Sequence, residues 1–156
     1  MAFPYQRILC PIDFDENSTN ALDRAIEIAT HFKAAIFLIH AVPLVVQSGE
    51  VPLPIDFFRA QQDVALARLN EIAGRKLSTI EHKTVVYAGD VAGSILQAVD
   101  QFQPDLVVLA THGRTGLVRF VLGSIAEAVV RRASCPVLTI RSERPRAQES
   151  AGGNKS

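Results

Sequence analysis

The residues best suited to chemistry lie in one loop, between residues 110 and 124. It reads Ala110-Thr111-His112-Gly113-Arg114-Thr115-Gly116, then runs through residues 117–122 to Gly123-Ser124. Glycines let the backbone come close to a ligand, and a helix that begins at Gly123 would point free N–H groups and a positive dipole end into the loop. Arg114 adds a positive charge, while Thr115 and Ser124 add hydroxyl donors. The loop therefore predicts an anion site, with a phosphate chain as its natural guest.

A purely structural interpretation of this loop stays open. Ser124 is followed three residues later by Glu127, which is the spacing of a capping box that needs no ligand. Gly113 and Gly116 could serve only to turn the chain. The loop has no Walker A lysine and the chain has no G-x-G-x-x-G, so the two better-known phosphate cradles are excluded.

Other polar residues have simple structural roles available to them. Asp13 stands after a strand and before a helix, so the local sequence favours helix capping. The histidines show no ligand spacing, and no metal site is expected from them; they are His31, His40, His82 and His112. His112 could orient a water beside a phosphate, and a loop hydrogen bond is its simpler role. Arg131 and Arg132 end a helix, where they complement its dipole, so no site is assigned to them.

Five short apolar segments are typical of strands buried on both faces, and they span residues 7–12, 35–42, 83–88, 105–111 and 136–141. Apolar residues recur at helical spacing in residues 21–32, 57–76 and 91–102. A fourth helix opens at Gly123, with Ala126, Val129, Val130 and Ala133 expected to face inward. This alternation predicts a single-domain α/β fold, a five-stranded and mostly parallel sheet with helices on both faces. Ligands of such sheets bind beyond the carboxyl ends of the strands, where strand order reverses.

Length and composition limit the class of protein. A chain of 156 residues that is 48% hydrophobic suits one domain with a full core. Sixteen Lys and Arg balance sixteen Asp and Glu, which gives no electrostatic case for nucleic acid or an anionic membrane as partner. The N-terminus has no signal-peptide pattern, which predicts a cytoplasmic protein, and Cys10 and Cys135 are expected to be buried, reduced thiols. Residues 43–55 hold three prolines and are expected to be irregular, and the polar tail 142–156 is predicted to be disordered.

The loop resembles the signature G-x₂-G-x₉-G-[ST] of the ATP-binding branch of the universal stress protein family. The four fixed positions fall on Ala110, Gly113, Gly123 and Ser124, with nine residues between the second and the third. Further similarities are the first strand with Asp13, the second-strand ending Ala41-Val42, Gly89, and Cys135-Pro136. The resemblance covers about residues 5–141, and residues 1–141 are taken as the domain. Alanine replaces the first signature glycine at position 110, which would be a serious obstacle only if the backbone φ there had to be positive.

The resemblance implies a Rossmann-like fold of the adenine nucleotide α-hydrolase type, with strand order 3-2-1-4-5. It also implies a site for an adenine nucleotide, ATP foremost, with or without Mg²⁺. Pro11, Ile12 and Asp13 would line the ribose and adenine pocket, and Ala41 would contact adenine through its backbone. The residues implied at the phosphates are His112, Gly113, Arg114, Thr115 and Gly116, together with Gly123, Ser124 and Ile125 from the helix N-terminus.

Three functions are compatible with these residues. The first is a regulatory module that binds ATP, the second a slow ATP hydrolase or phosphotransfer enzyme, and the third a nucleotide-free homodimeric interaction module. The chain lacks paired carboxylates near the loop, so no catalytic residue is assigned and the binding module is favoured. An apolar last strand, Val137-Leu138-Thr139-Ile140-Arg141, would lie at the sheet edge and invite pairing with a second chain. The family commonly forms homodimers through this strand, so a homodimer is expected, and the sequence names no other protein partner.

Overall fold

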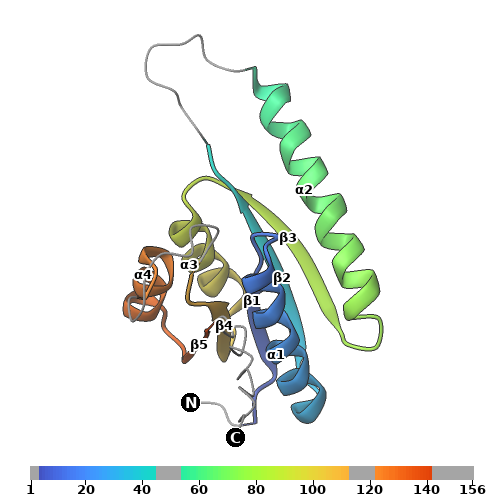
Figure 1. The fold of residues 1–156 in the computed structure, drawn as a ribbon, viewed down its shortest axis with the longest axis vertical. Coiled ribbons are helices and arrows are strands. Elements are labelled where there is room, and N and C mark those ends of the chain that lie inside the picture. Colours follow the sequence, from blue (N-terminus) through green and yellow to red (C-terminus); the bar gives the residue numbers. More distant parts are fainter. Residues whose placement is uncertain (1–3, 45–53, 113–121, 142–156) are drawn as a thin grey trace, which may run out of the picture.

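The computed structural model of the protein describes residues 4–44, 54–112 and 122–141. Within these residues, strands and helices alternate as β1 (Arg7–Pro11), α1 (Glu16–Phe32), β2 (Ala35–Val42), α2 (Ile55–Lys76), β3 (His82–Ala88), α3 (Val91–Phe102), β4 (Leu106–Ala110), α4 (Ser124–Arg132) and β5 (Val137–Ile140). Neighbouring strands pair in parallel in the order β3-β2-β1-β4-β5. The predicted α/β fold and strand order are therefore confirmed (Figure 1).

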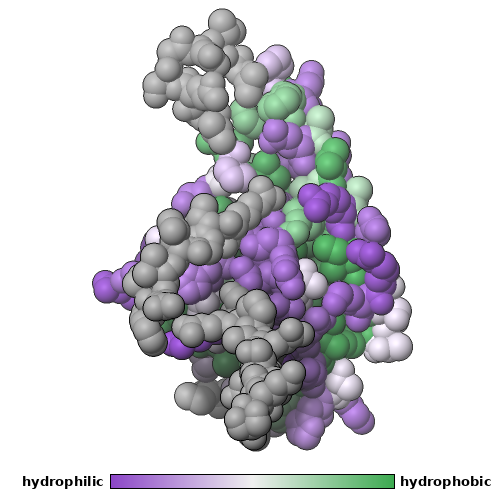
Figure 2. All heavy atoms as spheres, viewed as in Figure 1, coloured by the Kyte–Doolittle hydropathy of each residue, from purple (hydrophilic) through white to green (hydrophobic). Residues whose placement is uncertain are grey.

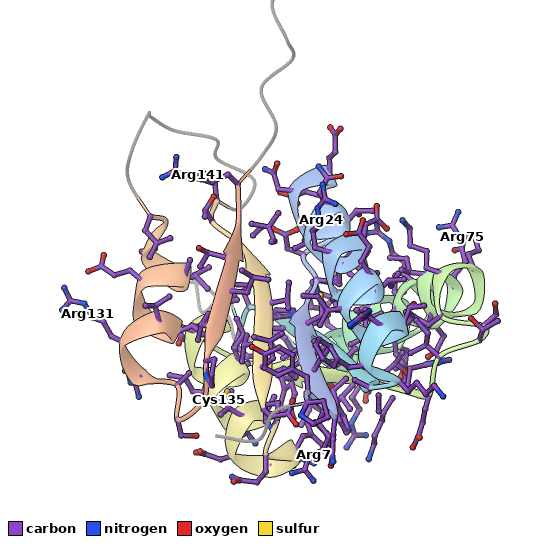
Figure 3. The ribbon with its side chains drawn as sticks, turned by 90° about the horizontal axis from the view of Figure 1, so that it is seen from below. Arg7, Arg24, Arg75, Arg131, Cys135 and Arg141 are labelled. Carbon is purple, nitrogen blue, oxygen red and sulfur yellow. The ribbon has the colours of Figure 1, made fainter. Side chains whose placement is uncertain are left out.

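Two hydrophobic cores lie on the two faces of the sheet. Helices α1 and α2 cover one face and α3 and α4 the other, as the view along the sheet in Figure 3 shows. Alternate residues of a strand point to opposite faces. Thus Ile8 and Val108 pack toward α1 and α2, whereas their neighbours Leu9 and Val107 pack toward α3 and α4. Burial on both faces explains why the strands read as unbroken apolar runs.

The element ends differ slightly from the sequence prediction. β4 and β5 are each two residues shorter than predicted, and α2 begins at Ile55 rather than residue 57. Pro54 is the N-cap of α2, a position where the missing proline N–H costs no intrahelical bond. The predicted irregular stretch lies mostly, and the tail 142–156 wholly, outside the described residues. Among the helices that the structure describes, none is long and apolar enough to cross a membrane.

The strand order reverses between β1 and β4. β1 pairs with β2 on one side and with β4 on the other. The helices that follow β1 and β4 lie on opposite faces of the sheet. In sheets of this kind such a reversal puts the ligand crevice beyond the carboxyl ends of these two strands. Asp13 and Thr111 follow the two strand ends and so flank this crevice.

Candidate functional site

The loop after β1 brings the predicted ribose and adenine residues to the crevice. Pro11 is the last residue of β1, and Ile12 is buried, with its N–H donating to the Ile39 carbonyl at 2.8 Å. Asp13 follows directly. Ala41 lies near the end of the neighbouring strand β2. The structure therefore places these four predicted residues at the same edge of the sheet.

Asp13 fixes the turn before α1 and does not cap the helix. The N-cap is Asp15, whose carboxylate accepts the Ser18 N–H at 2.8 Å. Asp13 Oδ1 accepts the Asp15 N–H at 3.1 Å, and the Asp13 N–H donates to Ser18 Oγ at 3.3 Å. Burial raises the pKa of Asp15, and the nearby Asp13 carboxylate raises it further, against the lowering effect of the Ser18 N–H. The prediction that Asp13 caps the helix is therefore wrong, because the N-cap of α1 is Asp15, two residues further on.

Ala110 ends β4 with ordinary strand geometry. It pairs with Ile140 of β5, and it is not among the described non-glycine residues with positive φ. The alanine at the first signature position therefore meets no backbone obstacle.

Thr111 and His112 directly follow β4, on the other side of the strand-order reversal. Thr111 is 5% exposed, and its N–H donates to the Ile140 carbonyl at 2.9 Å. Its Oγ1 lies 2.9 Å from His112 Nδ1. His112 Nε2 is buried and has no hydrogen-bond partner among the described residues. A buried polar atom without a partner is costly, so this nitrogen is a candidate for contact with a ligand.

Gly123 joins the start of α4 to the end of β4. Its N–H donates to the Thr111 carbonyl at 2.8 Å, and a Cβ at this position would lie 2.7 Å from that carbonyl oxygen. Only glycine allows this approach. The sequence assigned Gly123 to phosphate binding. In the structure its N–H is bonded to Thr111, and this contact holds α4 against β4.

The capping box predicted for Ser124 and Glu127 does not form. Gly123 is the N-cap of α4 and no side chain caps this helix, so Ser124 occupies the first helical position. Glu127 instead pairs with Arg131 at 2.9 Å. Helix geometry leaves the N–H groups of Ser124 and Ile125 without intrahelical acceptors, and both residues are exposed. The prediction of a capping box, which would have explained Ser124 and Glu127 without a ligand, is therefore wrong.

The remaining phosphate candidates, Gly113, Arg114, Thr115 and Gly116, lie outside the described residues. Arg131 lies in the last turn of α4 and points away from the sheet (Figure 3). Within residues 4–44, 54–112 and 122–141, no three His, Cys, Asp or Glu side chains group as metal ligands.

Residues 4–141 match the model of the universal stress protein family. The chain belongs to this family. It is 30% identical over 142 residues to universal stress protein MJ0531 of Methanocaldococcus jannaschii, covering 88% of this chain and 82% of that protein. It is 32% identical over 141 residues to universal stress protein A homolog 2 of Coxiella burnetii, covering 88% and 95%.

Solved structures agree with this universal stress protein fold. Protein MJ0577 of Methanocaldococcus jannaschii has a TM-score of 0.78 at 22% identity, covering 90% of this chain and 99% of that one. A universal stress protein in complex with cAMP has a TM-score of 0.65 at 22% identity, with coverages of 89% and 98%. A family member from Arabidopsis thaliana with AMP bound has a TM-score of 0.59 at 16% identity, with coverages of 93% and 97%. At these identities the likeness shows the fold alone.

Sequence reasoning missed Thr111 as a residue of the site. Its hydroxyl lies within hydrogen-bond distance of His112 Nδ1, and its carbonyl accepts the Gly123 N–H. Thr111 thus joins the end of β4 to the start of α4. A hydroxyl residue at the end of a buried strand, directly before a histidine, was the available signal. The link to Gly123 could not be read from sequence, because twelve positions separate the two residues.

Proposed function

We propose that this universal stress protein binds an adenine nucleotide, with ATP as its foremost ligand, and acts as a regulatory module. The nucleotide would lie across the crevice between β1 and β4. Its adenine and ribose would face Pro11, Ile12, Asp13 and Ala41. Its phosphates would face His112 and the N-terminus of α4.

The observation that carries the proposal is the buried Nε2 of His112. The Thr111 hydroxyl lies 2.9 Å from Nδ1. In the tautomer whose Nδ1 accepts this hydrogen bond, Nε2 carries the proton and is a donor toward the phosphate. The N–H groups of Ser124 and Ile125, and the positive end of the α4 dipole, offer further donors for the same anion. Donors without acceptors at a topological switch point fit a phosphate group well.

Two further observations support a nucleotide. Ala110 has no positive φ, so the one departure from the glycine signature does not deform the backbone. Family members of the same fold have been solved with cAMP and with AMP. Both ligands share the adenosine and one phosphate, which is the part that this crevice would hold. Mg²⁺ would be carried by the phosphates, and no protein ligand is assigned to it.

The protein would act by binding rather than by catalysis, since no general base is assigned beside the phosphates. A homodimer through β5 is part of the proposal. β5 is an edge strand of the described sheet, and Leu138 on it is 38% exposed. A cytoplasmic location stays a prediction from the sequence.

The proposal is tested by titration calorimetry of nucleotide-free protein with ATP and with adenosine. His112→Ala removes the Nε2 donor, so we expect ATP affinity to fall about tenfold or more, with adenosine affinity unchanged. His31→Ala is the matched control, because His31 is an exposed histidine in the last turn of α1. Equal affinities of wild type and His112→Ala for ATP would contradict the phosphate position. No binding of ATP at millimolar concentration would contradict the function itself.

A further inference from the structure

The face of helix α2 that packs on the sheet continues beyond the end of the sheet, where nothing in the described residues covers it. Toward the C-terminal end of the helix this face is buried under the sheet, at Ala65, Leu69 and Ala73. The same face continues toward the N-terminus through Phe57, Ala60, Gln61 and Val64, where the helix runs past the strands (Figure 1). Phe57 is 44% exposed and Val64 is 62% exposed. Hydrophobic side chains are accordingly visible along α2 in Figure 2.

These residues form one wall of a groove, which we name the α2 groove. Its other wall consists of Phe14, His40 and Val42, and Arg68 lies along its side. The groove has a volume of about 530 Å³, within the range of small-molecule sites. Its described lining is mostly apolar and contains no acidic residue.

Phe14 is held in an unusual conformation beside this groove. Its φ is 67°, in the left-handed region that a bulky side chain avoids. Such a conformation persists only where the surroundings enforce it, and it is concentrated at functional sites. The Phe14 ring centroid lies 4.4 Å from that of His40, and the Arg68 guanidinium carbon lies 4.1 Å from the ring centroid. The strained turn thus places an aromatic ring under a cation at one end of the groove.

Arg68 has no carboxylate partner among the described residues. The other arginines of α2 pair along the helix, Arg59 with Asp56 at 3.9 Å and Arg75 with Glu71 at 3.8 Å. A positive charge beside an apolar cavity without acidic lining is complementary to an anionic head group on an apolar body.

The α2 groove lies on the opposite face of the sheet from α4. His40 pairs with Val86 of β3, which packs in the core under α1 and α2. The side chain of the adjacent Ala41 points to the other face, because successive residues of a strand alternate. The groove therefore shares no lining residue with the proposed nucleotide site.

We propose that the α2 groove binds a small amphiphile that has an apolar body and a single anionic group, with the anion beside Arg68. The probe for this site is 1-anilinonaphthalene-8-sulfonate, an aromatic sulfonate that fluoresces when its rings leave water. The full chain should bind it saturably at one site, and dodecanoate should displace it. Arg68→Gln should weaken binding about tenfold, and Val64→Glu should abolish it by adding a negative charge to the wall. Both positions are exposed on a helix, so both variants should fold.

The matched controls make the same changes outside the groove. Arg75→Gln alters a cation of α2 that points away from the sheet in Figure 3, and Val130→Glu alters an exposed valine of α4. Both should bind the probe as wild type does. The proposal is overturned if Arg68→Gln and Arg75→Gln behave alike, if Val64→Glu binds normally, or if binding does not saturate. Displacement of the probe by ATP would assign the groove to the nucleotide, and conversion of a dimer to a monomer by Val64→Glu would assign it to a second copy.

Discussion

Substitution of Gly123 by alanine tests the contact that holds α4 to β4. The added Cβ would lie 2.7 Å from the Thr111 carbonyl oxygen, a backbone atom that cannot rotate away. Either α4 or the end of β4 must shift, which weakens the 2.8 Å hydrogen bond between the Gly123 N–H and the same oxygen. Overpacking costs about 1–3 kcal/mol and a lost backbone hydrogen bond costs about 1 kcal/mol.

We therefore expect Gly123→Ala to lower the free energy of unfolding by about 2–3 kcal/mol, a substantial part of the stability of a domain. Urea unfolding followed by circular dichroism measures this loss, and the melting temperature should fall by roughly 5–10 °C. Gly74→Ala is the matched control. Gly74 lies inside α2 with nothing within 4 Å of a built Cβ, so alanine should stabilise the protein by about 0.5–1 kcal/mol.

A Gly123→Ala variant as stable as wild type would refute the close approach of α4 to β4. A Gly74→Ala variant as damaged as Gly123→Ala would show that any glycine substitution is disruptive and would remove the argument. Because Gly123 supports the fold, loss of nucleotide binding in its variants cannot locate the phosphates. Variants of His112 are better suited to that purpose.

Two further predictions concern ionisable groups that are partly or fully buried. Asp15→Ala should cost about 1 kcal/mol, since it removes the α1 cap, whereas Asp15→Asn keeps an acceptor for the Ser18 N–H and should not destabilise at neutral pH. The pKa of Asp15 is higher in the folded than in the unfolded protein, so the fold favours the protonated carboxyl. The free energy of unfolding therefore falls as pH rises and the folded carboxyl loses its proton. Any advantage of Asp15→Asn in urea unfolding should therefore vanish at acid pH, and an advantage that grows there would contradict the raised pKa. Burial raises the pKa of Cys10 to about 12, and burial followed by the Asp105 carboxylate raises that of Cys135. A thiol reagent at neutral pH should thus leave Cys10 unmodified until guanidinium is added and modify Cys135 slowly, and rapid labelling of Cys10 in the native protein would refute its burial.

The sheet could be predicted because its strands are buried on both faces. Runs such as Leu106–Ala110 have no polar residue, and amphipathic stripes separate them, so only a parallel sheet between two helical layers satisfies the pattern. Among the helix residues predicted to face the core, Val130 is the one clear error, because its side chain is 45% exposed. α4 covers the edge strand β5, where no further strand lies beneath its outer side.

The details of the candidate site depend on contacts between distant residues. Ser124 and Glu127 satisfy the local rule for a capping box, yet Gly123 takes the cap because its N–H bonds to Thr111 across the loop. The left-handed Phe14 likewise has no local signal, since phenylalanine is among the residues least expected there. Local sequence encodes propensity, and these positions are decided by tertiary packing instead.

The central claim is that an adenine nucleotide lies between the loop after β1 and the start of α4. Titration of ¹⁵N-labelled protein with ATP, followed through its backbone amide resonances, tests this claim most directly. The account predicts saturable shifts at Asp13, Ala41, Ser124 and Ile125, with AMP shifting the two α4 amides less than ATP does. Unchanged amides at the start of α4 in the presence of saturating ATP would contradict it.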